Sequence, residues 1–257
     1  MFLVKSCHSQ DNVHRRKTLR IGTLDEYRST EQLQIVDEHE GTFTFEMDLK
    51  GIHIERELFN FMNHSHNSFV HLYCYELASG GRSSVILDGI YLRRYKASIK
   101  MRNINRFIFC MSLVDHYDDA QNIFPEYDDK WFFDQKKAFF IAEEIGRQLN
   151  KQIALKEKGG VQVFEGDYDI NKVHPVIKIQ TINYKDRMIN VDNQFFYKNW
   201  NEISSAMTGA SFIKPRRYSH EKEIRFIFDY HFGDIILSPA MNSIIVPMRD
   251  EVLRFFK

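Results

Sequence analysis

Residues 223–230 read Glu-Ile-Arg-Phe-Ile-Phe-Asp-Tyr, and large apolar side chains recur in them at every second position. Successive side chains of a β-strand point to opposite faces of a sheet, so this stretch predicts a strand with one apolar face in the core. The residues of that face are Ile224, Phe226, Phe228 and Tyr230. Glu223 and Arg225 would project together from the other face. There they could bind a charged ligand, or they could form an ordinary ion-pair ladder in contact with solvent.

The same two-residue period recurs through most of the chain and favours a fold rich in strands. Further strand candidates, which are rich in Val, Ile, Phe and Tyr, cover residues 43–49, 52–54, 68–76, 84–95, 106–113, 161–164, 176–184 and 243–247. Lys50 and Gly51 stand between the first two of these runs and predict the turn of a hairpin.

Two segments have the spacing of amphipathic helices. Residues 129–155 carry an apolar stripe at helical intervals, and Gly159 and Gly160 follow as a stop signal. Residues 193–207 carry a shorter stripe, with Gly209 after it. The predicted class is therefore α+β: a mostly antiparallel, strand-rich sheet core with one long and one or two shorter helices.

The composition narrows the organisation of the chain. A length of 257 residues allows one large domain or two small ones, and only 5 Pro and 12 Gly favour a single globular domain over residues 1–257. The tie between 35 basic and 35 acidic side chains argues against a general nucleic-acid coat. No apolar run is long enough to span a membrane, and three scattered cysteines fit a reducing cytosol, so a cytoplasmic protein is expected.

Common catalytic signatures are missing from the sequence. It has no Gly-x-x-x-x-Gly-Lys phosphate loop, no Gly-x-Gly-x-x-Gly turn, no Gly-x-Ser-x-Gly elbow, no His-Glu-x-x-His helix and no Cys-x-x-Cys pair. A P-loop ATPase, a dinucleotide dehydrogenase, an α/β hydrolase and a zinc finger are therefore disfavoured.

A basic segment precedes the strand at residues 223–230. Its Lys214, Arg216 and Arg217 would suit contact with phosphate. Ser112 lies at the end of an apolar strand candidate, a position from which a side chain can reach into a cleft. Cys110 has apolar neighbours in sequence and is interpreted as a buried filler of the core.

Acidic residues gather between positions 25 and 40 and allow several interpretations. They are Asp25, Glu26, Glu31, Asp37, Glu38 and Glu40. The segment could be a solvated loop, or it could act on a ligand that an Arg holds. Asp37, Glu38 and Glu40 could instead bind a divalent cation, since hard cations prefer oxygen ligands. His64 and His66 could chelate a metal or belong to a polar loop.

Several short motifs, in their order along the chain, resemble a widespread bacterial family of unknown function. Its typical members carry an Asn-Asp-Pro-Phe-Glu segment, a central Cys-Phe-Ser strand end and a late Lys…Glu-x-Glu-x-Arg strand. The matching stretches here are residues 18–28, Cys110-Met111-Ser112, Lys214 and Glu221-x-Glu223-x-Arg225. Asp37-Glu38-His39-Glu40-Gly41 stands in place of the first motif. The resemblance implies a role in bacterial conflict or phage defence.

More remotely, the chain is similar to ADP-ribosyltransferases of the Arg-Ser-Glu type, which cleave NAD. In that family an Arg on an early strand holds the NAD phosphates, a Ser on a middle strand orders the nicotinamide ribose, and a Glu-x-Glu on a late strand completes the site. The likeness assigns these roles to Arg20, Ser112, Glu221 and Glu223. It makes Glu223 the stabiliser of the oxocarbenium-like cation and Glu221 the residue that positions the acceptor. Tyr27 would stack on the nicotinamide.

Three functions therefore stay open. The first is an NAD-consuming, ADP-ribosyltransferase-like effector toxin, with a protein or nucleic acid as its target. The second is a non-catalytic sensor that binds a nucleotide or another anionic small molecule through basic side chains. Those side chains are Arg20, Lys214, Arg216 and Arg217. The third is a metal-dependent nuclease that uses the acidic segment.

Overall fold

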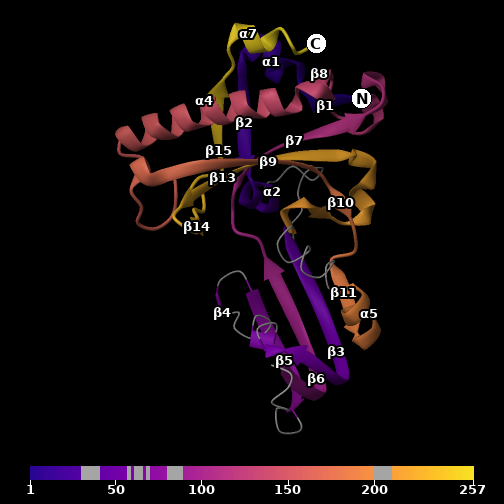
Figure 1. Cartoon of the computed structure of the whole chain (residues 1–257). Coiled ribbons are helices and arrows are strands. Elements are labelled where there is room, and N and C mark those ends of the chain that lie inside the picture. The colour runs from indigo at the N-terminus through magenta and orange to yellow at the C-terminus, as the bar shows by residue number, and fades with distance from the viewer. Residues whose placement is uncertain (30–40, 57–58, 61–65, 68–69, 80–88, 200–209) are drawn as a thin grey trace. The chain divides into compact units, whose positions relative to one another are not determined.

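The computed structural model describes residues 1–29, 41–56, 59–60, 66–67, 70–79, 89–199 and 210–257. Their contacts divide the chain into two compact units (Figure 1). The first unit comprises Met1–Glu40, Ile104–Asn183 and Arg217–Lys257, and the second comprises Gly41–Asn103 and Tyr184–Arg216. Each unit has its own hydrophobic core. The single domain expected over residues 1–257 stays a prediction.

An antiparallel sheet forms the centre of the first unit. Its strands are β1 (Phe2–Cys7), β2 (Thr18–Thr23), β7 (Phe107–Val114), β8 (Asp129–Asp134), β9 (Val173–Thr181), β13 (Glu223–Phe232), β14 (Ile235–Ile236) and β15 (Ser243–Pro247). The main path runs β14-β13-β7-β1-β8, with β9 also paired to β13 and β2 joining β7 to β15. The strand predicted at residues 223–230 is thus confirmed as β13, which pairs with β7, β9 and β14.

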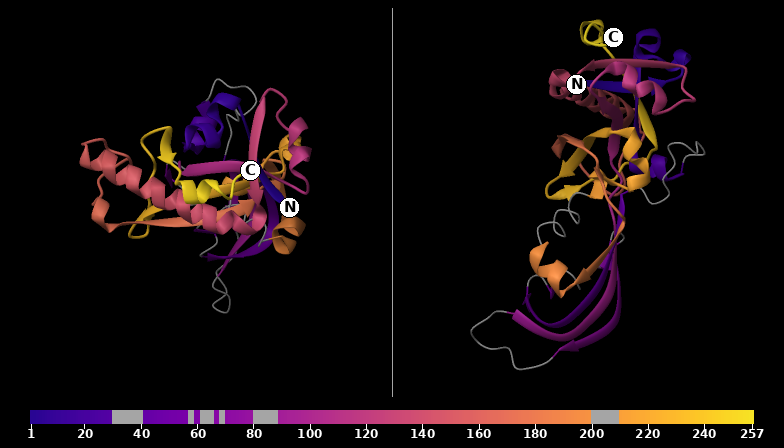
Figure 2. Two further views of the ribbon diagram at one scale, coloured as in Figure 1. Left: turned by 90° about the horizontal axis from the view of Figure 1, so that it is seen from above. Right: turned by 90° about the vertical axis from the view of Figure 1, so that its right-hand side faces the viewer.

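One long helix, α4 (Ala138–Lys158), lies along one face of this sheet (Figure 1 and Figure 2). Its apolar stripe packs with the alternating apolar residues of β13 in one core, as the pattern predicts. Gly146 allows a close approach, because a Cβ atom there would lie 2.8 Å from the Cδ1 atom of Ile177 on β9. The helix ends at Lys158, directly before Gly159, which the sequence predicts as its stop.

The predicted start of this helix at residue 129 is wrong. Residues 129–134 form β8, which pairs with β1 over its whole length. Trp131 and Phe133 are both buried in the core, so the apolar pattern there has the period of a strand. The helical pattern begins only after Asp134, whose side chain accepts a hydrogen bond from the backbone of Lys136.

The second unit contains a five-stranded sheet in the order β11-β3-β6-β5-β4. Its strands are β3 (Thr42–Glu55), β4 (His66–Asn67), β5 (Val70–Ser79), β6 (Gly89–Arg102) and β11 (Met188–Asp192). β11 runs parallel to β3, and the other pairs are antiparallel. The helix α5 (Asn193–Lys198) begins where the pattern predicts, with the Asp192 carboxylate as its N-terminal cap. Residues 200–207 of that predicted helix and Gly209, its predicted stop, lie outside the described residues.

The hairpin predicted at Lys50 and Gly51 is wrong, because β3 continues through both residues and pairs with β6 on either side of them. Gly51 adopts a left-handed backbone with φ of +59°. This local irregularity shifts the alternation, so that Leu49 and Ile52 are both buried although they are three residues apart. In the sequence this change of alternation resembles a turn, but in the structure the long strand is continuous.

The remaining elements are short. They are η1 (Ser9–Asp11), α1 (Val13–Arg16), α2 (Leu24–Ser29), η2 (Tyr117–Asn122), η3 (Gln135–Lys137), η4 (Ile170–Lys172), β10 (Asn183–Tyr184), η5 (Ala210–Phe212), β12 (Ile213–Lys214), η6 (Arg216–Glu221) and α7 (Asp250–Leu253). The strand predicted at residues 161–164 reduces to one isolated bridge between Phe164 and Pro239. The strand-rich, mostly antiparallel α+β class is confirmed. In the part of the chain that the structure describes, no helix combines the length and the apolar character needed to cross a membrane.

A buried carboxylate connects α4 to the segment before α7. Glu144 accepts hydrogen bonds from Nε and Nη2 of Arg249, both at 2.8 Å, and from Nε2 of Gln148 at 2.7 Å. Burial alone would raise the pKa of Glu144. The hydrogen bonds from Arg249 and Gln148 and the charge of Arg147 outweigh burial and hold this pKa below its usual 4.5.

We therefore expect Glu144→Gln to lower the free energy of unfolding by about 1–3 kcal/mol at pH 7, because it removes charge-assisted bonds to a buried acceptor. A depressed carboxyl pKa stabilises the fold above the unfolded value and loses this effect as the pH falls through the folded value. The melting temperatures of wild type and variant should therefore converge as the pH falls below the depressed pKa of Glu144. Glu143→Gln, on the exposed face of the same helix, is the matched control. Equal melting temperatures of Glu144→Gln and wild type at pH 7 would contradict the assignment.

Candidate functional site

Three neighbouring strands of the first unit carry polar side chains on the face opposite to α4. β7 lies between β2 and β13 in the sheet. Ile21, Phe109 and Phe226 point to the core beneath α4. By the alternation of a strand, the residues between them point to the other face. Those residues are Arg20 and Gly22 on β2, Cys110 and Ser112 on β7, and Glu223 and Arg225 on β13.

The register of the β7–β13 ladder brings predicted site residues together. Ser112 lies directly opposite Glu223, and Cys110 lies directly opposite Arg225. Directly opposite residues have Cβ atoms about 4.5–5.5 Å apart and therefore share one environment. Ser112 and Glu223 are each 5% exposed, so the site they form is sheltered from solvent.

Glu223 and Arg225 form a buried ion pair within one strand. Nε and Nη2 of Arg225 lie 2.8 and 2.7 Å from Oε1 of Glu223. Arg225 is 2% exposed, so the prediction that this pair could lie on a solvated face is wrong. Removing one partner of such a pair costs about 3–5 kcal/mol, because the other charge is left buried. Arg225 therefore fixes the position of the Glu223 carboxylate.

The thiol of Cys110 completes this cluster. Burial, together with the negative charge of Glu223 and a hydrogen bond from the thiol to its carboxylate, raises the Cys110 pKa to about 12. The interpretation of Cys110 as an apolar core filler is corrected, because its side chain lies on the polar face beside Glu223. A thiol with so high a pKa stays protonated near neutral pH and is a poor nucleophile.

Tyr27 reaches the same cluster from α2. Burial raises its pKa well above the ordinary value, and the negative charge of Glu223 acts in the same direction. The phenol is therefore neutral near pH 7. Gly22 makes this placement possible, since a Cβ atom there would lie 3.3 Å from the Tyr27 ring and 2.5 Å from Oε2 of Glu26. Both side chains thus lie directly over the backbone of β2.

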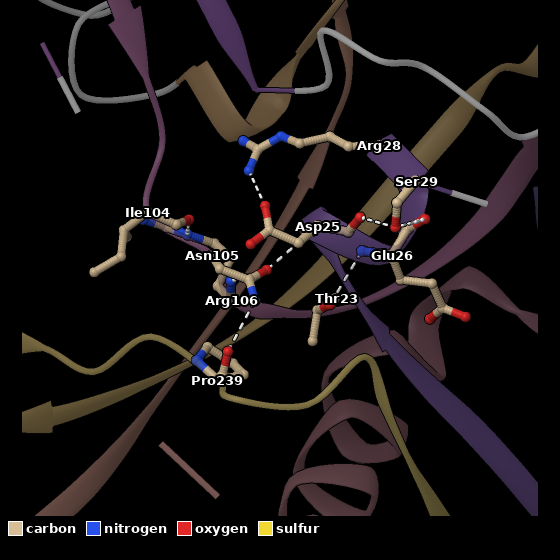
Figure 3. Close-up of polar contacts among 9 residues, drawn as sticks. All are labelled: Thr23, Asp25, Glu26, Arg28, Ser29, Ile104, Asn105, Arg106 and Pro239. Atoms are coloured by element: carbon tan, nitrogen blue, oxygen red, sulfur yellow. Dashed lines mark hydrogen bonds and ion pairs between the residues drawn. The ribbon is translucent and has the colours of Figure 1, made fainter. Parts of the chain in front are cut away.

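The start of α2 is fixed by a buried amide that the sequence pattern did not single out (Figure 3). Oδ1 of Asn105 accepts a hydrogen bond from the backbone N–H of Asp25 at 3.0 Å, and its Nδ2 donates to the carbonyl of Pro239 at 3.0 Å. The hydroxyl of Thr23 accepts from the backbone N–H of Glu26 at 3.3 Å. Because three separate segments meet at Asn105, α2 has a defined position on the sheet.

Arg20 stands at the exposed margin of this face. Its guanidinium forms an ion pair with Oε1 of Glu26. The Arg20 side chain is 59% exposed and that of Glu26 is 14% exposed. Exposed ion pairs contribute at most about 1 kcal/mol, so this pair is far easier to open than the buried pair on β13.

The other predicted site residues are distributed differently. Glu221 is buried at the end of η6, and Lys222 after it has a left-handed φ of +48°. Glu221 therefore does not share a strand face with Glu223, which corrects the expected Glu-x-Glu strand. Arg217 is exposed and lies over the Tyr218 ring, with 4.9 Å from its guanidinium carbon to the ring centroid.

Lys214 and Arg216 of the basic segment belong to the second unit. Lys214 is buried in β12, and its carbonyl accepts a hydrogen bond from the backbone of Lys185. Arg216 is exposed, with its Nε atom 3.8 Å from the carboxylate of Asp186. The segment predicted to contact phosphate is thus divided between the two units.

The acidic segment offers no described metal site. Glu31, Asp37, Glu38, Glu40 and His64 lie outside the described residues, whereas Asp25 and Glu26 belong to α2. Within the described ranges, no group of three or more His, Cys, Asp or Glu side chains could hold a metal ion.

Sequence reasoning missed a second buried charge on the polar face. Asp229 is 1% exposed, and its Oδ2 lies 2.8 Å from Nζ of Lys178 and 3.4 Å from Nη1 of Arg106. Burial lowers the pKa of Arg106, and the charge of Asp229 acts against that shift. The signal was the strand period itself, since Asp229 continues the series of Glu223 and Arg225.

Comparisons of the chain with protein-family models, with curated proteins and with solved structures found no match. The site is therefore interpreted from its own geometry and chemistry.

The thiols give a direct check of this geometry. We expect an aromatic disulfide reagent at pH 8 to label Cys74 quickly, because it is exposed. Cys7, which is buried, should react only on unfolding, and Cys110, which is partly exposed but whose pKa burial and Glu223 raise to about 12, should react far more slowly than Cys74. Cys74→Ser should abolish the fast phase. Rapid labelling of Cys110 in the native protein, located by peptide mass spectrometry, would contradict the placement of its thiol beside Glu223.

Proposed function

We propose that the polar face of the first unit binds NAD and that the protein is a cytosolic, ADP-ribosyltransferase-like enzyme. The observation that carries the proposal is the placement of Arg20, Ser112 and Glu223 on three adjacent strands with their side chains on one face. The resemblance to a bacterial family supplies the setting, an effector in conflict or phage defence. The acceptor would be a protein or a nucleic acid.

In the proposed reaction the glycosidic bond of the nicotinamide ribose breaks. Nicotinamide leaves with the bonding electron pair, and the ribose carbon acquires oxocarbenium character. The fixed negative charge of Glu223 would stabilise that cation, and a preorganised charge in a sheltered site is worth much more than one in water. An acceptor then attacks the ribose carbon and loses its proton to solvent.

The surrounding residues would prepare Glu223 for this role. Arg225 holds its carboxylate in place, and Ser112, directly opposite, could orient the ribose hydroxyls. The neutral phenol of Tyr27 would offer an aromatic face near the nicotinamide. Arg20 would hold the pyrophosphate, since a guanidinium binds phosphate oxygens in a bidentate manner.

One observation favours a second candidate, a sensor that binds a nucleotide without turnover. The Glu223 carboxylate is already bound by Arg225 and is only 5% exposed, so its access to a substrate is restricted. Such a sensor would use the exposed Arg20 and would not need Glu223 for chemistry.

NAD consumption by the purified full chain tests the proposal. Ser112→Ala leaves the ion pair on β13 intact, and we expect it to lower the rate by about 10–100-fold. The paired variant Glu223→Leu/Arg225→Met removes both charges together, which avoids an uncompensated buried charge. We expect it to lower the rate by at least about a hundredfold, the loss typical of a removed electrostatic stabiliser.

Ser98→Ala is the matched control, since Ser98 is a strand serine of similar burial in the second unit. Its rate should equal that of wild type. A wild-type protein that NAD stabilises against heat without consuming it would favour the sensor. A protein that neither consumes nor binds NAD would exclude the transferase and an NAD sensor.

A further inference from the structure

The two ion pairs of the polar face differ in how readily a ligand could replace a partner. The Glu223–Arg225 pair is buried on a central strand, with side chains 6% and 2% exposed. The Arg20–Glu26 pair is open to solvent on the side of Arg20, which is 59% exposed. A dissolved anion can therefore approach Arg20, whereas the guanidinium of Arg225 is sheltered.

The position of Glu26 follows from the way α2 is anchored. Asn105 and Thr23 hold the first backbone N–H groups of the helix, and Gly22 leaves space for the Glu26 side chain against β2. Figure 3 shows the Asp25 carboxylate turned towards Arg28, with the Glu26 carboxylate pointing the other way. The two acidic residues of α2 thus have different partners although they are neighbours in sequence.

A carboxylate and a phosphate present similar oxygens to a guanidinium. We propose that Glu26 is a built-in competitor, whose carboxylate occupies Arg20 until the pyrophosphate of a nucleotide displaces it. This inference rests on the proposed function only for the binding of pyrophosphate at Arg20. It requires no movement of α2, because the backbone anchors at Asn105 and Thr23 do not involve the Glu26 side chain.

A ligand must displace the Glu26 carboxylate before it can bind Arg20, so the charge of the ligand matters. A single phosphate would exchange one anion for another at Arg20 and gain little. A pyrophosphate carries more charge and more acceptor oxygens, so it competes better for the same guanidinium. The contact would therefore favour ligands with a pyrophosphate group over monophosphates.

Binding of inorganic pyrophosphate to the full chain, measured by calorimetry at low salt, tests this inference. We expect Glu26→Gln to bind pyrophosphate about three- to fivefold more tightly than wild type, as the loss of one exposed ion pair allows. Asp25→Asn removes the same charge from the same helix but leaves Arg20 paired with Glu26. It should change the affinity less than twofold. Arg20→Ala should weaken binding at least tenfold.

Equal affinities of Glu26→Gln and Asp25→Asn would overturn the inference, because charge on α2 alone would then explain the effect. No binding of pyrophosphate by wild type and Glu26→Gln would overturn it as well. The outcome is separate from that of the NAD assay. If Glu26→Gln binds pyrophosphate more tightly but the protein never consumes NAD, the role of Glu26 as a competitor is supported and only the transferase proposal is excluded.

Discussion

Strand β13 imposes the constraint on which the rest of the first unit depends. Every residue from Glu223 to Tyr230 is buried, so neither face of this part of the strand is left to water. An ionised group in such a place must have a partner of opposite charge, because an unpaired buried charge is very costly. The strand meets this condition within itself, through Glu223 and Arg225, and through neighbouring segments, where Arg106 and Lys178 flank Asp229.

This arrangement gives the polar face a fixed charge pattern. The carboxylate of Glu223 is held by Arg225 and accepts a hydrogen bond from the Cys110 thiol. Ser112 and Tyr27 add neutral hydroxyl groups to the same sheltered region. The chain as a whole has no net charge, but its charges are unevenly placed on this face. The carboxylate of Glu223 is held in position, whereas the guanidinium of Arg20 is accessible to solvent.

Much of the fold could be predicted from local periodicity, and much of the site could not. The period of two in β13 and the stripe in α4 are strong because both elements bury one complete apolar face. The predictions at Gly51 and at residues 129–134 were wrong. A change in the apolar alternation can mark either a turn or an irregular strand, and a short apolar run fits either a helix or a strand. The pairing of Ser112 with Glu223 depends on strand register, which comes from contacts between distant segments. The position of Tyr27 depends on Asn105 and Gly22, whose roles appear only when the sheet is formed.

The pairing of β2 has a consequence for biosynthesis. β2 pairs with β15 over residues 18–22, so Gly22 lies opposite Ser243, which is more than two hundred residues later in the sequence. Such long-range pairs form late, because the intervening chain must be ordered first. During translation, β2 could not pair with β15 until β15 had emerged from the ribosome. The margin of the sheet that carries Arg20 would then be assembled only after β15 has been synthesised, and a nascent chain that ends before β15 would lack this margin.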